Sequence, residues 1–253
     1  MRRLMWTLTG ENRREHGNPN ADGTMAGSYG SGYGYNKESE IDTAQRYKSM
    51  IPHLDTHVSE DKALYDRAIY TVAAIIGERR TPHFINFGAS YAHIDARLAV
   101  MFPDTRFICV DRSEAVRQLN TEDFGAIENM EFVVGNILSL LKPTVDGGIL
   151  FTSRTLTLLP KGFVAKLYDT ARKAGIEFIV GMEPTGISRE TGSEYQFSKE
   201  ADLLSVWYRG QMFIHNYPHL LKESGYEHVE FSLVKTGHPH PDFRIASFVG
   251  VRP

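Results

Sequence analysis

The sequence contains a single cysteine, Cys109, among its 253 residues. One cysteine excludes an intrachain disulfide, and a thiol inside an apolar run is typical of inert strand packing. No apolar run approaches the about 18 residues that a membrane-spanning helix needs. The first residues also lack the apolar region of a signal peptide. We therefore expect a cytoplasmic protein with no membrane partner.

An excess of basic charge is also lacking. The chain has 28 lysines and arginines against 31 aspartates and glutamates, which gives a formal net charge of −3. A protein that binds nucleic acid would present a basic face, so we expect a small-molecule substrate and no nucleic-acid partner. The length suits one α/β domain with an extension.

The N-terminal part differs in composition from the rest. Residues 27–35 consist only of glycine, serine and tyrosine, and a helical pattern follows at 38–47. We divide the chain into 1–60, a Gly/Tyr-rich segment with a helical cap, and 61–253, the main domain. The first 40 residues are either a tail or a lid whose tyrosines, such as Tyr33, cover a ligand.

The main domain alternates between strand patterns and helix patterns. Strands are expected at 84–87, 107–111, 131–134, 149–152, 177–182, 229–235 and 244–251, and helices at 61–77, 92–101, 113–118, 161–174 and 213–224. The region before Trp207 is expected to be irregular. Five alternating units followed by a terminal hairpin predict an α/β, doubly wound, mainly parallel sheet with an antiparallel edge.

One unit of this pattern has the parts of a nucleoside site. The run 84–87 ends in Gly88-Ala89-Ser90-Tyr91, a helical pattern follows, and the next run ends at Asp111. Ligands of doubly wound folds bind where the strands end, and an acidic residue about 20 positions on can accept both ribose hydroxyls. The full glycine set for a pyrophosphate is absent, which favours a nucleoside cofactor without one.

This combination resembles the class I S-adenosylmethionine-dependent methyltransferases, from about Tyr65 to the C-terminus. The resemblance implies a Rossmann-like sheet of seven strands whose last strand inserts antiparallel, with S-adenosylmethionine as cofactor. It implies that the turn holds the methionine moiety and Asp111 the ribose. It also implies that Asn136 bonds the adenine amino group, with a simple turn as the alternative, and that Ile137 packs against the adenine ring. The cofactor residues it implies are Gly88, Ala89, Ser90, Tyr91, Asp111, Arg112, Asn136, Ile137, Thr152 and Ser153. Two positions depart from the family: Asn86, where an acid is frequent, and Ser90, where a second glycine is frequent.

Candidate substrate residues follow the strands. The motif Asp/Asn-Pro-Pro-Tyr of enzymes that methylate adenine or amide nitrogen is absent after strand four, where Arg154 stands instead. Arg154 either holds a carboxylate or phosphate of the substrate or forms a salt bridge to a neighbouring helix. The other candidates are Tyr33, Trp207, Tyr208 and Asn216, with core packing as the alternative for the aromatic ones.

A hydroxyl acceptor needs a base within hydrogen-bond reach. The candidates are Glu183, at the end of strand five, and His215, near the start of the late helix, where His215 and Asn216 could instead cap that helix. His238 and His240 flank a proline in the last loop, but two histidines without a third ligand do not define a metal site. We expect no metal.

Taken together, these features predict methyl transfer from S-adenosylmethionine to a small molecule, at a hydroxyl of a sugar or natural-product scaffold. The segment 213–226 resembles bacterial sugar O-methyltransferases. Methylation of a small amine, a nicotinamide-dependent reductase and a non-catalytic binding protein are the alternatives. The reductase is disfavoured by the missing glycines. The oligomeric state stays open, with a homodimer as one candidate.

Overall fold

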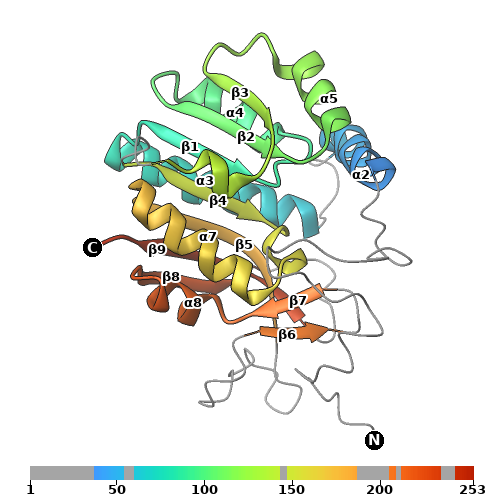
Figure 1. Cartoon of the computed structure of the whole chain (residues 1–253). Helices are drawn as coiled ribbons and strands as arrows, with labels where there is room; N and C mark the ends of the chain where they lie inside the picture. Colours follow the sequence, from blue (N-terminus) through green and yellow to red (C-terminus); the bar gives the residue numbers. More distant parts are fainter. Residues whose placement is uncertain (1–36, 54–59, 143–146, 187–204, 209–211, 235–242) are drawn as a thin grey trace, which may run out of the picture.

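The structure is a computed structural model that describes residues 37–53, 60–142, 147–186, 205–208, 212–234 and 243–253. Its centre is a seven-stranded sheet in the order β3-β2-β1-β4-β5-β9-β8 (Figure 1). The strands are β1 (His83–Phe87), β2 (Arg106–Asp111), β3 (Met130–Val134), β4 (Ile149–Ser153), β5 (Phe178–Gly186), β8 (Glu227–Leu233) and β9 (Phe243–Val251). Strands β1 to β5 pair in parallel, and β9 lies antiparallel between β5 and β8. The predicted seven-stranded sheet is confirmed.

Helices cover both faces of this sheet (Figure 1). The helical elements are α2 (Lys37–Met50), η1 (Ile51–His53), α3 (Glu60–Arg79), α4 (His93–Met101), α5 (Glu114–Phe124), α6 (Ile137–Leu140), η2 (Leu156–Leu158), α7 (Lys161–Ala174) and α8 (Tyr217–Glu223). Helices α3 and α4 pack on one face, and α6, α7 and α8 pack on the other. No described helix combines the length and the hydropathy needed to cross a bilayer.

The two faces follow from the alternation of side chains along each strand. In β1, Phe84 packs among the residues of α3 and α4, whereas Ile85 and Phe87 pack against the opposite layer. In β4, Phe151 lies on the α3 side and Leu150 on the α7 side. Residues on both faces are apolar, as expected for strands that are covered twice.

The expected cap at Ser113 and the expected end before Gly175 are confirmed, whereas α3 and α5 run past their expected ends at 77 and 118. Ser113 caps α5, because its side chain accepts a hydrogen bond from the backbone N–H of Val116. Gly175 ends α7 with φ +97°, a left-handed conformation that glycine adopts without a steric penalty.

The predicted helix at 213–224 is wrong in its first part. Met212–His215 form strand β7, which pairs antiparallel with β6 (Ser205–Tyr208) in a separate two-stranded sheet. The irregular region expected before Trp207 therefore contains β6. Asn216 caps α8, and Pro218 lies in its first turn. This proline suits a helix start, while pairing with β6 decides the conformation of the four residues before it.

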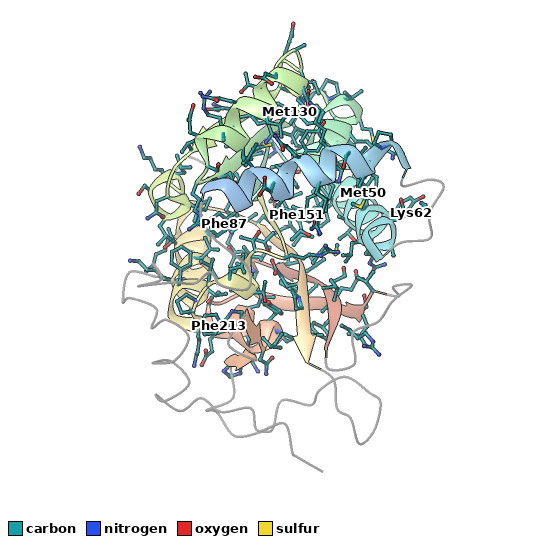
Figure 2. All side chains as sticks on the ribbon, turned by 90° about the vertical axis from the view of Figure 1, so that its right-hand side faces the viewer. Met50, Lys62, Phe87, Met130, Phe151 and Phe213 are labelled. Carbon is teal, nitrogen blue, oxygen red and sulfur yellow. The ribbon has the colours of Figure 1, made fainter. Side chains whose placement is uncertain are left out.

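Helix α2 lies across the end of the sheet at which the parallel strands finish (Figure 2). Ala44 of α2 is fully buried against Tyr91 and Val116, beyond the ends of β1 and β2. Lys48 pairs with Asp123 of α5 at 2.6 Å. A helical cap is therefore present at 37–50, and the division of the chain at residue 60 stays a prediction.

Candidate functional site

A pocket opens at the carboxyl ends of β1 and β4, on the side of the sheet that α3 and α4 cover. Its walls come from α2, α3, α4 and the loops that follow β1 and β4. Figure 2 labels Met50 and Phe151, which both line it. The lining residues are Tyr47, Met50, Leu64, Tyr65, Asn86, Gly88, Ala89, Ser90, Tyr91, His93, Ile94, Asp95, Phe151, Ser153 and Arg154. The predicted turn residues 88–91 thus meet Ser153 and Arg154 in one place.

The turn after β1 can be built only with a small residue at its first position. Gly88 has φ +76°, and a Cβ there would lie 2.3 Å from the Thr155 hydroxyl oxygen. Ser90 also adopts a left-handed conformation, with φ +48°. The missing Cβ lets Gly88 pack against Thr155 of the loop after β4, and Gly88, Ala89 and Ser90 all line the pocket.

Asp111 holds this turn in place from the end of β2. Its Oδ2 accepts a hydrogen bond from the Ser90 N–H at 3.1 Å, and its Oδ1 accepts one from the Ser113 N–H at 3.0 Å. Each carboxylate oxygen keeps acceptor capacity after one such bond, so the side chain can also accept from two hydroxyls of a ligand. The neighbouring Arg112 is exposed and does not line the pocket.

Asn120 supports the same turn from α5 and was missed by the sequence analysis. This buried side chain accepts from the Ala92 N–H at 3.0 Å and donates to the Ser90 carbonyl at 2.7 Å. It follows Ser113 by two helical turns, so a polar residue on the buried face of α5 was the available signal.

A second missed residue, Asp95, is a buried carboxylate in the pocket. It lies in the first turn of α4 with 1% of its surface exposed. Its Oδ2 accepts a hydrogen bond from the Asn86 amide at 2.8 Å. Burial raises the pKa of Asp95 to about 6. Its place on the helix face that also carries the buried Leu98 and Ala99 was the available signal.

Aromatic rings surround His93 at the start of α4. The His93 ring stacks on Tyr65 with 5.1 Å between centroids and lies 6.2 Å from Tyr47 and 6.0 Å from Tyr91. Its Nδ1 lies 2.8 Å from the Tyr91 carbonyl oxygen. A carbonyl only accepts, so Nδ1 carries the hydrogen and Nε2 is the basic nitrogen of the neutral ring.

Arg154 closes the pocket against the cap helix. It has φ +53°, and its Nη1 donates to the Tyr47 hydroxyl at 2.9 Å. Arg154 thus contacts α2 through a hydrogen bond to a tyrosine hydroxyl, and the salt bridge to a neighbouring helix stays a prediction. Because Arg154 also lines the pocket, its use for an acidic substrate group stays a prediction.

Glu183 lies on the wrong face of the sheet for the predicted role as a base. It is fully buried, and its Oε1 accepts from the N–H groups of Thr155 at 3.1 Å and Leu156 at 3.2 Å. Burial and, after it, the nearby Glu183 carboxylate raise the pKa values of Tyr168 and Tyr217, which belong to the α7 and α8 layer. Burial raises the pKa of Glu183 itself to about 7. The side chain anchors the loop after β4 and has no contact with the pocket.

His215, the other predicted base, is also enclosed by protein. It is fully buried on β7, and its Nε2 lies 3.0 Å from the carbonyl oxygens of Leu156 and Leu159. Burial lowers its pKa to about 4, so the ring is neutral. Among the residues that the structure describes, it positions η2 and does not line the pocket.

The remaining predicted site residues have structural roles or lie outside the described residues. Ile137 is 1% exposed in the core, and its contact with adenine stays a prediction. Thr152 is fully buried and, as the neighbour of Phe151 and Ser153 on a strand, faces away from the pocket. Asn136 and Asn216 cap α6 and α8. Asn136 is exposed, so its adenine contact stays a prediction, as does the substrate role of Asn216. Tyr33, His238 and His240, and the side chains of Trp207 and Tyr208, lie outside the described residues.

Within the described part of the chain, no group of three or more His, Cys, Asp or Glu residues is arranged to hold a metal ion.

The strand order, the antiparallel insertion of β9 and the turn at the end of β1 define the fold of class I S-adenosylmethionine-dependent methyltransferases. Many solved structures share it. A candidate sarcosine dimethylglycine methyltransferase from Galdieria sulphuraria aligns with TM-score 0.56 and 12% identity, over 83% of this chain and 98% of that one. Human N-acetylserotonin methyltransferase in complex with S-adenosylmethionine aligns with TM-score 0.51 and 12% identity, over 86% of this chain.

These structural similarities establish the fold of the chain. This chain spans 56% of the human N-acetylserotonin methyltransferase chain. The [4+2]-cyclase SpnF shares the fold with TM-score 0.54 and 11% identity, over 85% of this chain and 96% of that one. No family model matches the sequence, and no curated protein matches it. The shared fold therefore does not by itself define the reaction.

Proposed function

We propose that the protein is a methyltransferase that uses S-adenosylmethionine and methylates a small molecule, with a hydroxyl group as the acceptor. One observation carries the proposal. The Gly88–Ser90 turn is tied to Asp111 at the end of β2, beside a pocket that a cap helix partly covers. This arrangement offers a backbone cradle and a ribose acceptor at the strand ends, where ligands of doubly wound sheets bind.

The residues present fit the cofactor in three ways. Gly88 lines the pocket in a left-handed conformation, Asp111 retains acceptor capacity for a ribose diol, and Asp95 offers a buried carboxylate. When bound, S-adenosylmethionine supplies a methyl group that passes from sulfur to the acceptor oxygen in one displacement and leaves S-adenosylhomocysteine. The crystallised human N-acetylserotonin methyltransferase, which shares the fold, holds S-adenosylmethionine.

The chain's own residues would position the acceptor and take its proton. Tyr47 and Arg154 join across the pocket mouth and reduce its access to water. The Nε2 of His93 is the basic nitrogen of a ring that lines the pocket, so we assign it as the proton acceptor in place of Glu183 and His215. Arg154 would bind an acidic group on the substrate.

Calorimetric titration with S-adenosylhomocysteine tests the cofactor assignment. We expect wild type to bind and Asp111→Ala to lose a few kcal/mol of binding free energy, roughly a hundredfold or more in Kd. Asp104→Ala is the matched control, because Asp104 is exposed in the turn that precedes β2, at the opposite end of the strand. If wild type, freed of any copurified ligand, does not bind, the proposal is wrong, and nicotinamide cofactors should be titrated next.

A further inference from the structure

The carboxylate of Asp95 has an oxygen without a strong donor. Oδ2 accepts the Asn86 amide, whereas Oδ1 is buried and no described side chain places a nitrogen or hydroxyl donor on it; the Cys109 thiol and the Asp95 backbone N–H are the other groups that interact with the carboxylate. Within the same part of the chain, no lysine or arginine pairs with Asp95. A buried carboxylate oxygen without a strong donor raises the free energy of the folded protein. A ligand that places a donor on Oδ1 would offset this cost.

The groups packed around Asp95 are poor substitutes for a cation. The Cys109 thiol of β2 lies against the carboxylate, and burial together with that negative charge raises the pKa of Cys109 well above its ordinary value. A neutral thiol is a weak donor. Because the pKa of Asp95 is about 6, the carboxylate is mostly ionised at neutral pH.

The position of Asp95 indicates which ligand group it meets. It lines the pocket, and its partner Asn86 lies two residues before Gly88 on β1, so the carboxylate sits beside the turn. A small donor with a positive charge, a primary ammonium, is the chemical complement of such an oxygen. Two ligands could carry it: the methionine moiety of the cofactor at the turn, or an amine on the methyl acceptor.

We propose that Asp95 binds the α-ammonium group of the cofactor's methionine moiety. Position 86, where an acid is frequent in the resembled family, is an amide here, and the carboxylate that touches it comes from α4 instead. The inference rests on the proposed function, and it assigns to Asp95 the contact that distinguishes the amino-acid end of the cofactor from its nucleoside end.

The test compares two probes by calorimetry: S-adenosylhomocysteine, which has the ammonium, and 5′-methylthioadenosine, which lacks the amino-acid end. We expect Asp95→Asn to raise the Kd of S-adenosylhomocysteine about ten- to hundredfold, which is the range for loss of a hydrogen bond to a charged group. Affinity for 5′-methylthioadenosine should stay within about twofold. Thermal melting establishes that the variant is folded.

The double variant Asn86→Asp/Asp95→Asn is the matched control. It keeps one carboxylate and one amide in contact and moves the charge from α4 to β1. We expect it to recover at least part of the lost affinity for S-adenosylhomocysteine.

The other outcomes separate the inference from the proposed function. If Asp95→Asn binds both probes as wild type does, the ammonium is not bound here, and the cofactor assignment stands. If the substitution lowers the affinity for both probes equally, Asp95 shapes the turn and recognises no ammonium, which also overturns the inference. If wild type binds neither probe, both the inference and the proposed function are wrong.

Discussion

At the scale of single residues, the glycine at the turn permits a sharp test. Gly88→Ala should destabilise the fold by about 1–3 kcal/mol and abolish binding of S-adenosylhomocysteine, because the new Cβ would meet Thr155 and φ is +76°. Gly162→Ala is the matched control: a Cβ at this position of α7 meets nothing within 4 Å. It should be neutral or stabilising by up to about 1 kcal/mol. Thermal unfolding and calorimetry of both variants provide the comparison, and equal effects would contradict the steric explanation.

The buried Glu183 makes stability depend on pH. Its pKa in the folded chain is about 7, above the ordinary 4.5, so the folded state keeps the proton that the unfolded state releases between these values. The stabilising effect of this proton is complete below about pH 4.5 and is lost as pH rises to about 7. Glu183→Gln keeps the hydrogen bonds to the loop after β4 but does not titrate, so it should not lose this stability as pH rises.

The measurement is the free energy of unfolding in urea at several pH values. As pH rises from 4.5 to 7, the free energy of unfolding of the variant should increase relative to that of wild type by about 3 kcal/mol at most. His215 titrates in an overlapping range, and its lowered pKa acts in the opposite direction, but it is present in both proteins and cancels in the difference. A constant difference across the range would show that Glu183 is charged in the folded state.

The proposed base has a kinetic signature. His93→Gln should lower the turnover number about a hundredfold, the smaller end of general-base effects, and leave the Kd of S-adenosylhomocysteine within about threefold. Release of S-adenosylhomocysteine in the presence of a methyl acceptor is the readout. His219→Gln on α8, where His219 pairs with Glu223 at 3.0 Å, is the control. Equal turnover in both variants would exclude His93 as the base.

The errors in site assignment at this scale have a common cause. Glu183 and Thr152 stand at the correct strand ends, but side chains alternate, and both face the α7 layer. The sequence places a residue at a strand end more readily than on one of two faces when both faces are apolar. Asp95 and His93 reach the pocket from a helix, and only the packing of α4 against β1 shows that they do.

At the scale of elements, local patterns predicted the strands and α7 well. The expected range 161–174 is identical to α7, because its apolar stripe and its final glycine are both local signals. The segment 212–215 was assigned to a helix because its partner β6 lies in a region without a strand pattern. Pairing between distant segments is the information that a local window lacks.

The cap helix α2 permits a prediction about motion. Asp123 accepts from the Tyr91 hydroxyl at 2.9 Å and pairs with Lys48, and so joins α2, the turn and α5. Asp123→Ala should accelerate hydrogen exchange in 41–50 by roughly fivefold to tenfold, yet change global stability by less than about 1 kcal/mol, as partly exposed ion pairs do. Asp169→Ala is the matched control, since Asp169 pairs with Lys173 on α7, away from the pocket. If exchange in 41–50 is unchanged, the apolar contacts of Ala44 alone hold the cap.

At the scale of the whole molecule, the two faces of the sheet differ: one is closed by packing and the other opens into the pocket. The α6, α7 and α8 side is a closed core that buries Glu183 and His215, whereas the α3 and α4 side opens at the strand ends into the pocket. The cap helix covers this opening from beyond the ends of β1 and β2 (Figure 2). A ligand bound there contacts the turn, α4 and the cap at once, so its binding should stabilise the folded domain as a unit.

Thermal unfolding measures this coupling. S-adenosylhomocysteine at a free concentration of about 100 times its Kd should raise the free energy of unfolding by about 2.7 kcal/mol. For a chain of this size, that corresponds to a rise in Tm of roughly 5 to 10 °C. NADH serves as the control for a nicotinamide site, and Asp111→Ala as the control for the ribose contact; neither should give a shift. A shift with NADH and none with S-adenosylhomocysteine would instead favour the reductase. A shift with S-adenosylhomocysteine in a protein that releases none of it with any acceptor would identify a protein that binds the cofactor without transferring its methyl group.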